Sequence, residues 1–462
     1  MINATVLTAL AAIVGRDQVL VDAADCWAYG YDNSRRHTPP DAVVFPHTHD
    51  HVLRIVQLCN QQRLPMVARG LGSGTVGAAV PLHGGVVLAL ERMARIVNID
   101  PANRACVVEP GVTNQNVQDA LAPHGFFWPP DPTSAAYCTV GGNLAFNSAG
   151  PRAIKYGTPR ENTLGLRAVT GDGREIRTGV YTTKGVVGYD LTRLIIGSEG
   201  TLAIITEATL KLTPLPQSKR TFQAAYRDMR SAAAAVSRLM AQPVTPYVLE
   251  FIDGNAIEMI RKYSTASLPE GAGAMLIFEI DGLEDGMHAA IKLLSAAAGG
   301  AGLVELKVAQ TQAEVDALWA TRKALSPALR TIAPKKINED VVVPVARMPD
   351  LIEGLDQLAQ QFEIKIINFG HAGNGNIHVN LLIDPDDPGQ LKRAEQCLDE
   401  VFALVLELHG TLSGEHGVGI EKREFIGREL DVTTLALMKQ IKNVFDPLGL
   451  LNPDKIFPLG HA

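Results

Sequence analysis

The sequence predicts an α+β fold in two parts, and a change of pattern near residue 217 is the main reason. Residues 40–215 alternate short β-branched runs, glycine turns and brief helices, whereas later residues alternate alanine-rich helical stretches with isolated strands. Pro214 and Pro216 mark the change, because proline ends a strand. At 462 residues the chain is also too long for one hydrophobic core. We expect a first domain at 1–216, an α+β cap with an antiparallel sheet at 217–416, and a return of 417–462 to the first domain.

The first domain is expected to alternate strands and helices from residue 41. "DAVVFP" (41–46) is a strand, the next segment carries Val52, Ile55 and Val56 at helical spacing, and "PMVARG" (65–70) is again a strand. The other strands expected there are "GVVLAL", "RACVVEP" and "TLAIITEATLKLTPLP". The elements expected in the cap are helices at 229–241, 285–298 and 311–330, strands at "AMLIFEI" and "KIINFG", and a long helix in "PGQLKRAEQCLDEVFALVLELHG".

Composition excludes several classes of protein. The net charge of −7 and the lack of a basic run argue against a nucleic-acid partner. No apolar run reaches the roughly 18 residues that a membrane-spanning helix needs. The 5 cysteines are scattered without a CxxC pair, so neither an iron–sulfur cluster nor a zinc ribbon is expected. We expect a cytoplasmic protein, with peripheral contact to the inner membrane left open.

Two glycine-rich loops in the first domain predict a site for an elongated anionic ligand. "RGLGSGTVG" (69–77) follows an expected strand, and closely spaced glycines let backbone N–H groups converge on an anion. The loop lacks the Gly-Lys-Ser/Thr of a P-loop and the distant acidic residue of a Rossmann fingerprint. Taken alone, it is as often structural as phosphate-binding. A second loop, "DPTSAAYCTVGGNLAFNSAG" (131–150), can clasp a dinucleotide pyrophosphate from the other side, and "GSEGTLAIITEATLKL" (197–212) can read a ring edge with its backbone.

Two histidines in "GHAGNGNIHVN" (370–380) predict a metal site in the cap. Strand alternation after the turn places Asn376, His378 and Asn380 on one face, with His371 arriving through the turn. Two imidazoles and one carboxylate form a common set of ligands for a divalent metal, and "GTLSGEHGVG" offers Glu415 as the carboxylate. The alternative is a pair of ordinary polar histidines beside a turn.

The order of the motifs resembles a known family. "PHTHDHV", "RGLGSGTVG", "VEPGVTN", "DPTS", "CTVGGNLAFNSAG" and "GSEGTLAIITEATLKL" resemble the FAD-binding domain of the vanillyl-alcohol-oxidase superfamily. "GHAGNGNIH", "GTLSGEHGVG" and "LNPDKIF" are similar to the C-terminal part of its D-lactate dehydrogenase and glycolate oxidase flavoprotein branch. The resemblance implies that FAD is held by Arg69, Gly70, Leu71, Gly72, Ser73, Gly74, Thr75, Gly77, Pro110, Gly111, Pro132, Ser134, Thr139, Gly142, Asn143, Ser148, Gly150, Tyr156, Gly157, Ile204 and Asn452. The first loop lacks the histidine that attaches flavin covalently in some relatives, so we expect non-covalent FAD.

Residues for the substrate follow from the same resemblance. It implies Arg322 as the clamp on a substrate carboxylate and Lys336 near the entrance, although a solvated charged face is an equal alternative for Lys336. Ser326 and Asn380 are further expected substrate contacts. His416 is the expected general base, because an imidazole with a near-neutral pKa can take the proton of an α-hydroxyl; a third metal ligand or a substrate hydrogen bond are its alternatives.

Two further expectations concern neighbouring histidines and the metal site. Asn374 stands where the family usually has aspartate, which predicts weaker metal binding. His47, His49 and His51 are expected in a solvated loop.

The sequence thus predicts FAD-dependent and metal-dependent oxidation of a D-2-hydroxy acid. D-lactate is the expected substrate, Zn²⁺ or Mn²⁺ the expected metal, and a 2-keto acid the product of hydride transfer to flavin. D-2-hydroxyglutarate dehydrogenase and the FAD subunit of a glycolate oxidase are alternatives, as is a metal-dependent hydrolase with merely structural glycine loops. Electrons must then pass to a quinone, a cytochrome or an electron-transfer flavoprotein, and a homodimer is left open.

Overall fold

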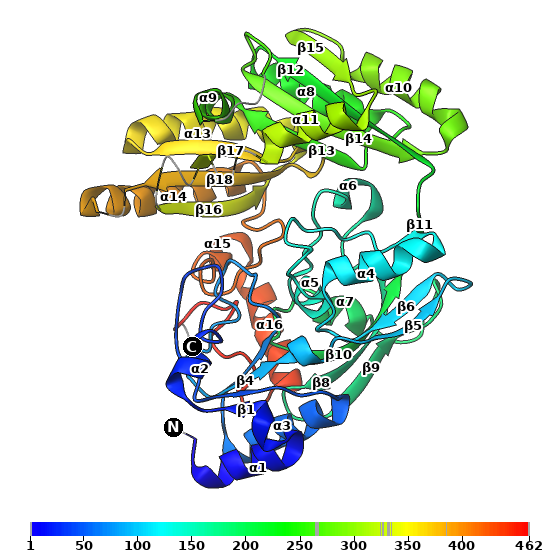
Figure 1. Cartoon of the computed structure of the whole chain (residues 1–462). Helices are drawn as coiled ribbons and strands as arrows, with labels where there is room; N and C mark the ends of the chain where they lie inside the picture. Colours follow the sequence, from blue (N-terminus) through cyan, green and yellow to red (C-terminus); the bar gives the residue numbers. More distant parts are fainter. Residues whose placement is uncertain are drawn as a thin grey trace. The chain divides into compact units, whose positions relative to one another are not determined.

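The computed structural model describes residues 2–263, 268–323, 325, 328–329, 333, 335–384 and 386–460. The chain forms two compact units. The first unit comprises Met1–Gly150, Gly157–Leu215 and Glu415–Ala462, and the second comprises Pro151–Tyr156 and Pro216–Gly414. Each unit combines helices with β-sheet, so the predicted α+β class is confirmed (Figure 1).

A four-stranded sheet forms one half of the first unit. Its order is β1 (Val19–Leu20), β2 (Ala42–Val44), β4 (Val86–Ala89), β3 (Met66–Arg69). Strands β2, β4 and β3 are parallel, and β1 pairs antiparallel to β2. Helices α1 (Ala4–Val14) and α3 (His49–Gln62) share a hydrophobic core with these strands. The fully buried Val52, Ile55 and Val56 are the residues whose spacing predicts the helix.

The start of α3 corrects one expectation from the sequence. Thr48 caps the helix by accepting the N–H of His51, so His49 and His51 lie in its first turn instead of a solvated loop. The Nδ1 of His49 lies 2.8 Å from the hydroxyl of Thr206. The histidine therefore ties α3 to a strand of the second sheet.

A five-stranded antiparallel sheet forms the other half of the first unit. Its order is β5 (Ile96–Asp100), β6 (Ala105–Val108), β10 (Ala203–Lys211), β8 (Thr163–Thr170), β9 (Glu175–Gly179). Trp128 lies fully buried in its core and donates its indole N–H to the carbonyl of Asn162 at 2.9 Å. The remaining elements of this unit are α2 (Ala23–Trp27), α4 (Asn114–Leu121), β7 (Phe126–Phe127), α5 (Val140–Phe146), α7 (Leu191–Ile195), β11 (Thr213–Pro214), α15 (Ile426–Glu429), α16 (Val432–Phe445) and the 3₁₀ turns Arg16–Gln18, Leu90–Arg92 and Ala122–His124.

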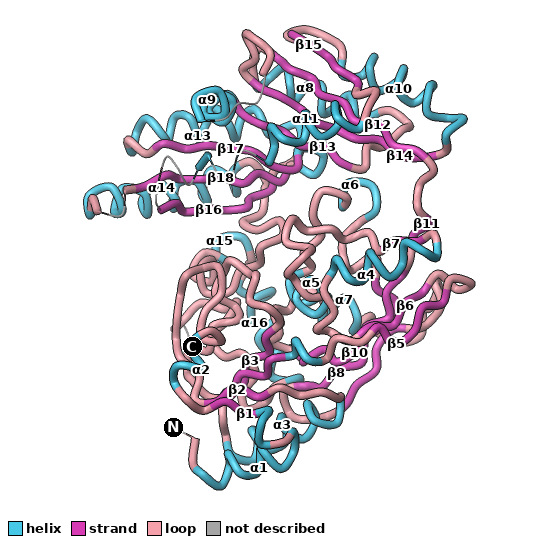
Figure 2. The backbone as a smooth tube through the Cα atoms, viewed as in Figure 1, coloured by secondary structure: helices cyan, strands magenta, loops and turns pink. Residues whose placement is uncertain are grey.

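The second unit is built on a seven-stranded sheet in which every neighbouring pair is antiparallel (Figures 1 and 2). Its order is β15 (Leu303–Val308), β12 (Ser218–Tyr226), β14 (Ala274–Gly282), β13 (Val248–Asp253), β17 (Lys365–His371), β18 (Asn376–Ile383), β16 (Lys335–Val342). Its helices are α6 (Ala153–Tyr156), α8 (Met229–Ala241), α9 (Gly254–Tyr263), α10 (Glu284–Ala298), α11 (Gln312–Lys323), α13 (Met348–Phe362) and α14 (Pro388–Glu407), with 3₁₀ turns at Val345–Arg347 and Ala372–Asn374.

The register of this sheet gathers polar residues on one face. Glu250 of β13 stands opposite His371 of β17, and His378 of β18 stands between Phe369 and Asp340. Directly paired residues point to the same side of a sheet, so these side chains share a face. Residues of the opposite face, such as Leu249, Phe251, Ile377, Val379 and Leu381, are apolar and at most 1% exposed. The predicted alternation in β18 is therefore confirmed.

Candidate flavin cavity and histidine pair

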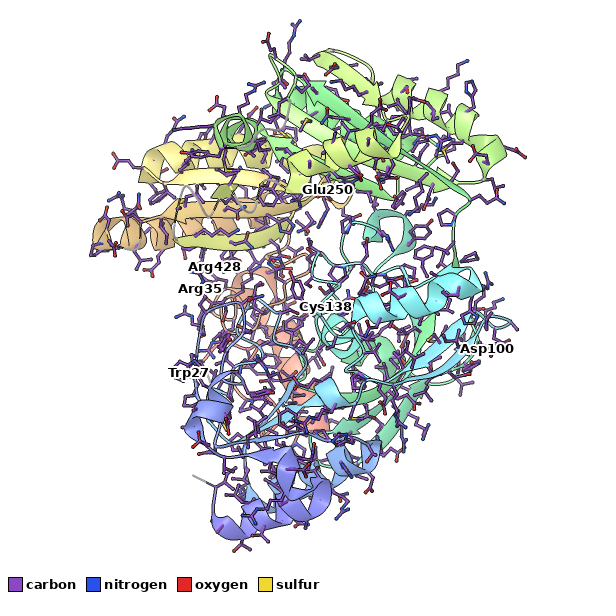
Figure 3. The ribbon with its side chains drawn as sticks, in the orientation of Figure 1. Trp27, Arg35, Asp100, Cys138, Glu250 and Arg428 are labelled. Atoms are coloured by element: carbon purple, nitrogen blue, oxygen red, sulfur yellow. The ribbon has the colours of Figure 1, made fainter. Side chains whose placement is uncertain are left out.

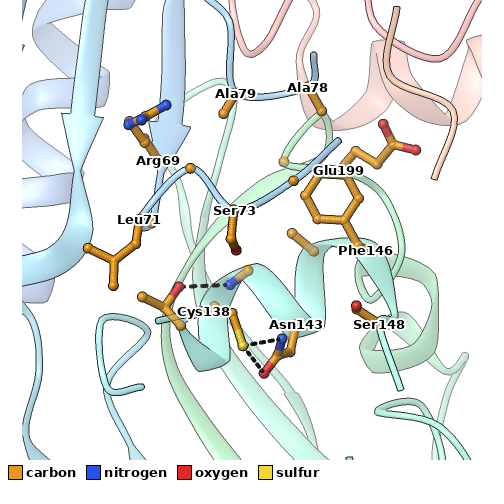
Figure 4. Close-up of a pocket in the computed structure, with 18 of the residues that line it drawn as sticks. Arg69, Leu71, Ser73, Ala78, Ala79, Cys138, Asn143, Phe146, Ser148 and Glu199 are labelled. Carbon is orange, nitrogen blue, oxygen red and sulfur yellow. Dashed lines mark hydrogen bonds between the residues drawn. The ribbon is translucent and has the colours of Figure 1, made fainter. Parts of the chain in front are cut away.

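The glycine-rich loops line one cavity within the first unit (Figure 4). The first loop leaves β3 at Arg69, and the second leads through Thr139 into α5, whose Gly142 N–H donates to the Thr139 hydroxyl at 3.2 Å. The two loops touch. A Cβ on Gly70 would lie 2.4 Å from Oγ1 of Thr139 in the second loop. Glycine is thus required where the loops meet.

Most residues expected at FAD are found in the cavity wall. They are Arg69, Gly70, Leu71, Gly72, Ser73, Gly74, Thr75, Pro110, Pro132, Ser134, Thr139, Gly142, Asn143, Ser148 and Ile204. The set includes glycines and the hydroxyl residues Ser73, Thr75, Ser134, Thr139 and Ser148, a composition that suits a dinucleotide with an anionic pyrophosphate. The wall residues therefore fit FAD.

Other expected FAD residues are not in the cavity wall, and several of them contact residues that are. A Cβ on Gly77 would lie 2.5 Å from Ile420, and one on Gly111 would lie 2.3 Å from the carbonyl of Leu90. Asn452 is buried and donates its side-chain N–H to the carbonyls of Ala78 and Glu199 at 3.0 and 2.8 Å. Gly150 and Gly157 both adopt a φ of 78°, which favours glycine. These residues shape the loops.

Tyr156 belongs to the second unit, and its hydroxyl donates to Asp281 at 2.7 Å. Lys155 also contacts the Asp281 carboxylate. A Cβ on Gly373 would lie 1.8 Å from Ile154, so the 151–156 segment packs closely on the histidine turn.

Arg69 has a structural task in this cavity. Its guanidinium donates to the carbonyls of Tyr31 and Ala28 at 2.6 and 3.1 Å. Burial lowers the pKa of Arg69, while the nearby Asp32 acts in the opposite direction. The side chain of Arg69 therefore holds the segment that contains Ala28 and Tyr31.

Glu199 lines the cavity, although it was not among the FAD residues predicted from the sequence. It belongs to the motif "GSEGTLAIITEATLKL". It adopts a left-handed φ of 53° and is buried. Its two carboxylate oxygens accept the N–H groups of Val418 and Gly419, each at 2.7 Å. Burial raises the pKa of Glu199 to about 7, although these N–H groups favour ionisation.

The segment that Glu199 holds at Val418 and Gly419 also contains two predicted site residues. Glu415 and His416 both line it, and Oε2 of Glu415 accepts the N–H of Gly150 at 3.2 Å. The general base expected from the sequence thus lies in the wall of the cavity that the glycine loops form. Asn33, Tyr137, Cys138 and Phe146 are further wall residues, and Asn33 lies in a stretch without a motif to signal it.

The histidine pair lies on the polar face of the second unit. His371 and His378 are buried, their ring centroids are 5.2 Å apart at 85°, and their ligand nitrogens lie within 4.8 Å of each other. Two imidazoles at this separation fit two positions around one divalent metal. The third expected ligand, Glu415, directly follows Gly414, whose N–H donates to Asp340 at 2.8 Å.

Glu250, labelled in Figure 3, is a buried residue of β13 that was not among the site residues predicted from the sequence. Its carboxylate contacts Nδ1 of His371 and accepts Nε–H of Arg322 at 2.8 Å. Burial opposes ionisation of Glu250, but the interactions of its carboxylate with His371 and Arg322 outweigh burial and lower its pKa to about 2. The Arg322 guanidinium also lies 4.7 Å from the ring centroid of Phe369.

The other substrate residues expected in the cap lie on the same face. Lys336 donates to Oδ1 of Asn380 at 2.7 Å, and the fully buried Asn380 donates to the carbonyls of Ile367 and His378 at 3.1 Å. Ser326 lies outside the described residues. The exposed Asn374 lies in the turn between the histidines.

Two family models match this chain. Residues 40–179 match the family described as "FAD binding domain", and residues 215–456 match "FAD linked oxidases, C-terminal domain". The glycolate oxidase subunit GlcD of Bacillus subtilis is 38% identical over 430 residues, which cover 93% of this chain and 92% of that protein. A D-lactate dehydrogenase of Archaeoglobus fulgidus is 35% identical over 440 residues, covering 93% and 95%.

Solved structures share the fold at lower identity. p-Cresol methylhydroxylase with substrate bound has a TM-score of 0.80 and 18% identity, covering 99% of this chain and 97% of that one. Alkyldihydroxyacetonephosphate synthase has a TM-score of 0.74 and 21% identity, covering 98% and 86%. The predicted vanillyl-alcohol-oxidase type of fold is therefore confirmed. Among the described residues, no helix has both the length and the apolar character needed to span a bilayer. The chain belongs to the family of FAD-linked oxidases and is an FAD-dependent oxidoreductase related to glycolate oxidase GlcD subunits and D-lactate dehydrogenases.

Proposed function

We propose that this enzyme oxidises a D-2-hydroxy acid, D-lactate first, to the 2-keto acid and passes the electrons to a separate acceptor. The observation that carries the proposal is the position of His416 in the wall of the glycine-loop cavity. A titratable base beside the flavin site is what removal of a hydroxyl proton requires. Family membership favours this reaction over the hydrolase alternative.

FAD is held without a covalent bond by the wall residues of the first unit. When bound, it supplies the acceptor for the hydride from C2 of the substrate. The first loop contributes glycines, Ser73 and Thr75, and no histidine is available there for attachment. His416 takes the hydroxyl proton.

A divalent cation, Zn²⁺ or Mn²⁺, is the second proposed cofactor, with His371, His378 and Glu415 as its ligands. When bound, it supplies Lewis acidity, which lowers the pKa of a coordinated hydroxyl. Two buried imidazoles on a polar sheet face support this assignment. Asp340 adds support, because it holds Gly414 and thereby directs the chain into Glu415. Asparagine at position 374 predicts weaker metal binding than in relatives with aspartate.

Arg322 is the proposed clamp for the substrate carboxylate. Its Nε–H is engaged by Glu250, which fixes the plane of the guanidinium. Lys336 and Asn380 are proposed as further contacts to the substrate, because a hydrogen bond between them holds the ammonium beside the amide. Ser326 remains proposed from the family resemblance alone.

Glycolate is a second candidate substrate, because the GlcD subunits of Bacillus subtilis and Escherichia coli are 38% and 36% identical to this chain. D-2-hydroxyglutarate is a third, with Lys336 available to its distal carboxylate. Since GlcD is named a subunit, a protein partner that accepts the electrons is part of the proposal, with quinone or cytochrome as alternatives. A cytoplasmic location with peripheral membrane contact and a homodimer are also proposed.

Anaerobic bleaching of the flavin tests the substrate. The purified enzyme is mixed with D-lactate, L-lactate, glycolate, D-2-hydroxyglutarate and D-mandelate in separate stopped-flow runs. We expect D-lactate to reduce the flavin with the highest second-order rate constant and L-lactate to be far slower. Fastest reduction by glycolate or D-2-hydroxyglutarate would move the assignment to that acid, and no reduction by any 2-hydroxy acid would refute the proposed reaction.

A further inference from the structure

Glu250 joins two proposed functional residues through a single buried carboxylate. Its side chain is 2% exposed, and that of its partner Arg322 is 17% exposed. One oxygen accepts Nε–H of Arg322 at 2.8 Å, and the other contacts Nδ1 of His371. The two partners come from distant elements, α11 and β17, and Glu250 lies on β13 between them.

The contact with His371 determines which ring nitrogen is left for a ligand. A carboxylate accepts hydrogen bonds, so Nδ1 of His371 carries the proton and Nε2 keeps its lone pair. A metal-binding histidine commonly has its second nitrogen held in this way, which fixes the ring and increases its basicity. The orientation of His371 is therefore set from the side opposite to the ligand nitrogen.

We propose that Glu250 is a positioning residue that fixes His371 in the Nδ1–H tautomer and holds the Arg322 guanidinium at the same time. One carboxylate then sets both a metal ligand and the substrate clamp. The inference rests on the proposed function, because it assumes that His371 binds a metal. Glu250, His371 and Arg322 all lie in helices or strands, so regular secondary structure holds the three residues in place.

Glu279 provides a matched control on the same sheet face. It is also a buried carboxylate, and it accepts hydrogen bonds from Thr221 at 2.6 Å and from the Trp319 indole at 2.7 Å. Trp319 lies one turn before Arg322 on α11, so both carboxylates anchor the same helix to the sheet. Among the described residues, Glu279 contacts Thr221, Tyr247 and Trp319, whereas Glu250 contacts His371. Glu279→Gln thus tests helix anchoring without a change at the histidine.

The experiment is a Zn²⁺ titration of full-length, FAD-loaded protein that a chelator has stripped of metal. Affinity is measured by competition with a chromophoric chelator for the wild type, E250Q, E279Q, R322Q and the double variant E250Q/R322Q. We expect E250Q to bind Zn²⁺ about 10- to 100-fold more weakly than the wild type. R322Q and E279Q are expected to bind it as tightly as the wild type.

The double variant protects the test against misfolding. E250Q alone leaves the Arg322 charge without its carboxylate, whereas E250Q/R322Q removes both charges, and we expect the same loss of affinity from it. Wild-type affinity in both variants would overturn the inference. An equal loss in R322Q or E279Q would also overturn it, because Glu250 would then act only by anchoring α11. Failure of the wild type to bind Zn²⁺ would refute the proposed metal site itself, and the inference with it.

Discussion

The carboxylate of Glu199 accepts the backbone N–H of Gly419 at 2.7 Å, across 220 positions of the sequence. A second bond to Val418 N–H makes the contact bidentate. Since His416 lies two residues before Val418, this buried carboxylate holds the segment that carries the proposed base. The contact couples a titratable group to the geometry of the cavity wall.

Stability is therefore expected to depend on the protonation of Glu199. Its pKa is raised from 4.5 to about 7, so the folded state binds the proton more tightly than the unfolded state. The contribution of protonated Glu199 to the free energy of unfolding is fully present below pH 4.5 and is lost as pH rises to about 7. The free energy of unfolding changes by roughly 3 kcal/mol over this window. Chemical unfolding from pH 4.5 to 8 checks this. Relative to the wild type, E199Q should gain stability across that window, and a pH-independent difference would contradict the prediction.

His416→Ala is expected to leave FAD bound and to slow flavin reduction about 10²- to 10⁴-fold. The reason is that the variant removes the proposed base without touching the glycine loops. Flavin content is measured by absorbance, and anaerobic reduction by stopped flow with D-lactate. The exposed His124→Ala is the matched control and should reduce at the wild-type rate. Undiminished reduction in His416→Ala would remove the base assignment.

Removal of metal is expected to abolish flavin reduction, and Zn²⁺ or Mn²⁺ is expected to restore it. His371→Ala should purify without a stoichiometric divalent metal, because it removes one of two buried imidazole ligands. Elemental analysis of the purified protein is the measurement. His409→Ala changes an exposed histidine of the same unit and should keep its metal. Full activity of a metal-free wild-type sample would exclude the cation from the reaction.

The sequence predicted those parts of the site that local pattern determines. Alternation alone placed Asn376, His378 and Asn380 on one face of β18, because side chains of a strand alternate strictly. The glycine loop at 69–75 was equally readable, since consecutive residues of one loop form the wall.

What the sequence did not predict depends on long-range pairing. Glu250 meets His371 across 121 positions, and only the register of β13 against β17 brings them together. The available signal was a charged residue within the apolar run "VLEFID", which requires a buried partner. Asp340 carries a similar signal in "NEDVVVP". Tyr156 is the reverse case, since the sequence places it close to the glycine loops and predicts it at FAD. In the structure it belongs to the second unit, where its hydroxyl donates to Asp281.

Gly70→Ala tests whether the contact between the two loops is needed for flavin binding. The added methyl group would lie 2.4 Å from Oγ1 of Thr139, and this hydroxyl caps α5, so neither loop can yield without losing a hydrogen bond. We expect a loss of stability of about 1–3 kcal/mol and a purified protein with little FAD. The ratio of flavin absorbance to protein absorbance measures occupancy. Gly427→Ala, where a Cβ meets nothing within 4 Å, should keep full occupancy. If Gly70→Ala retained FAD as well as Gly427→Ala does, the close approach of the loops would not be what shapes the cavity for the flavin.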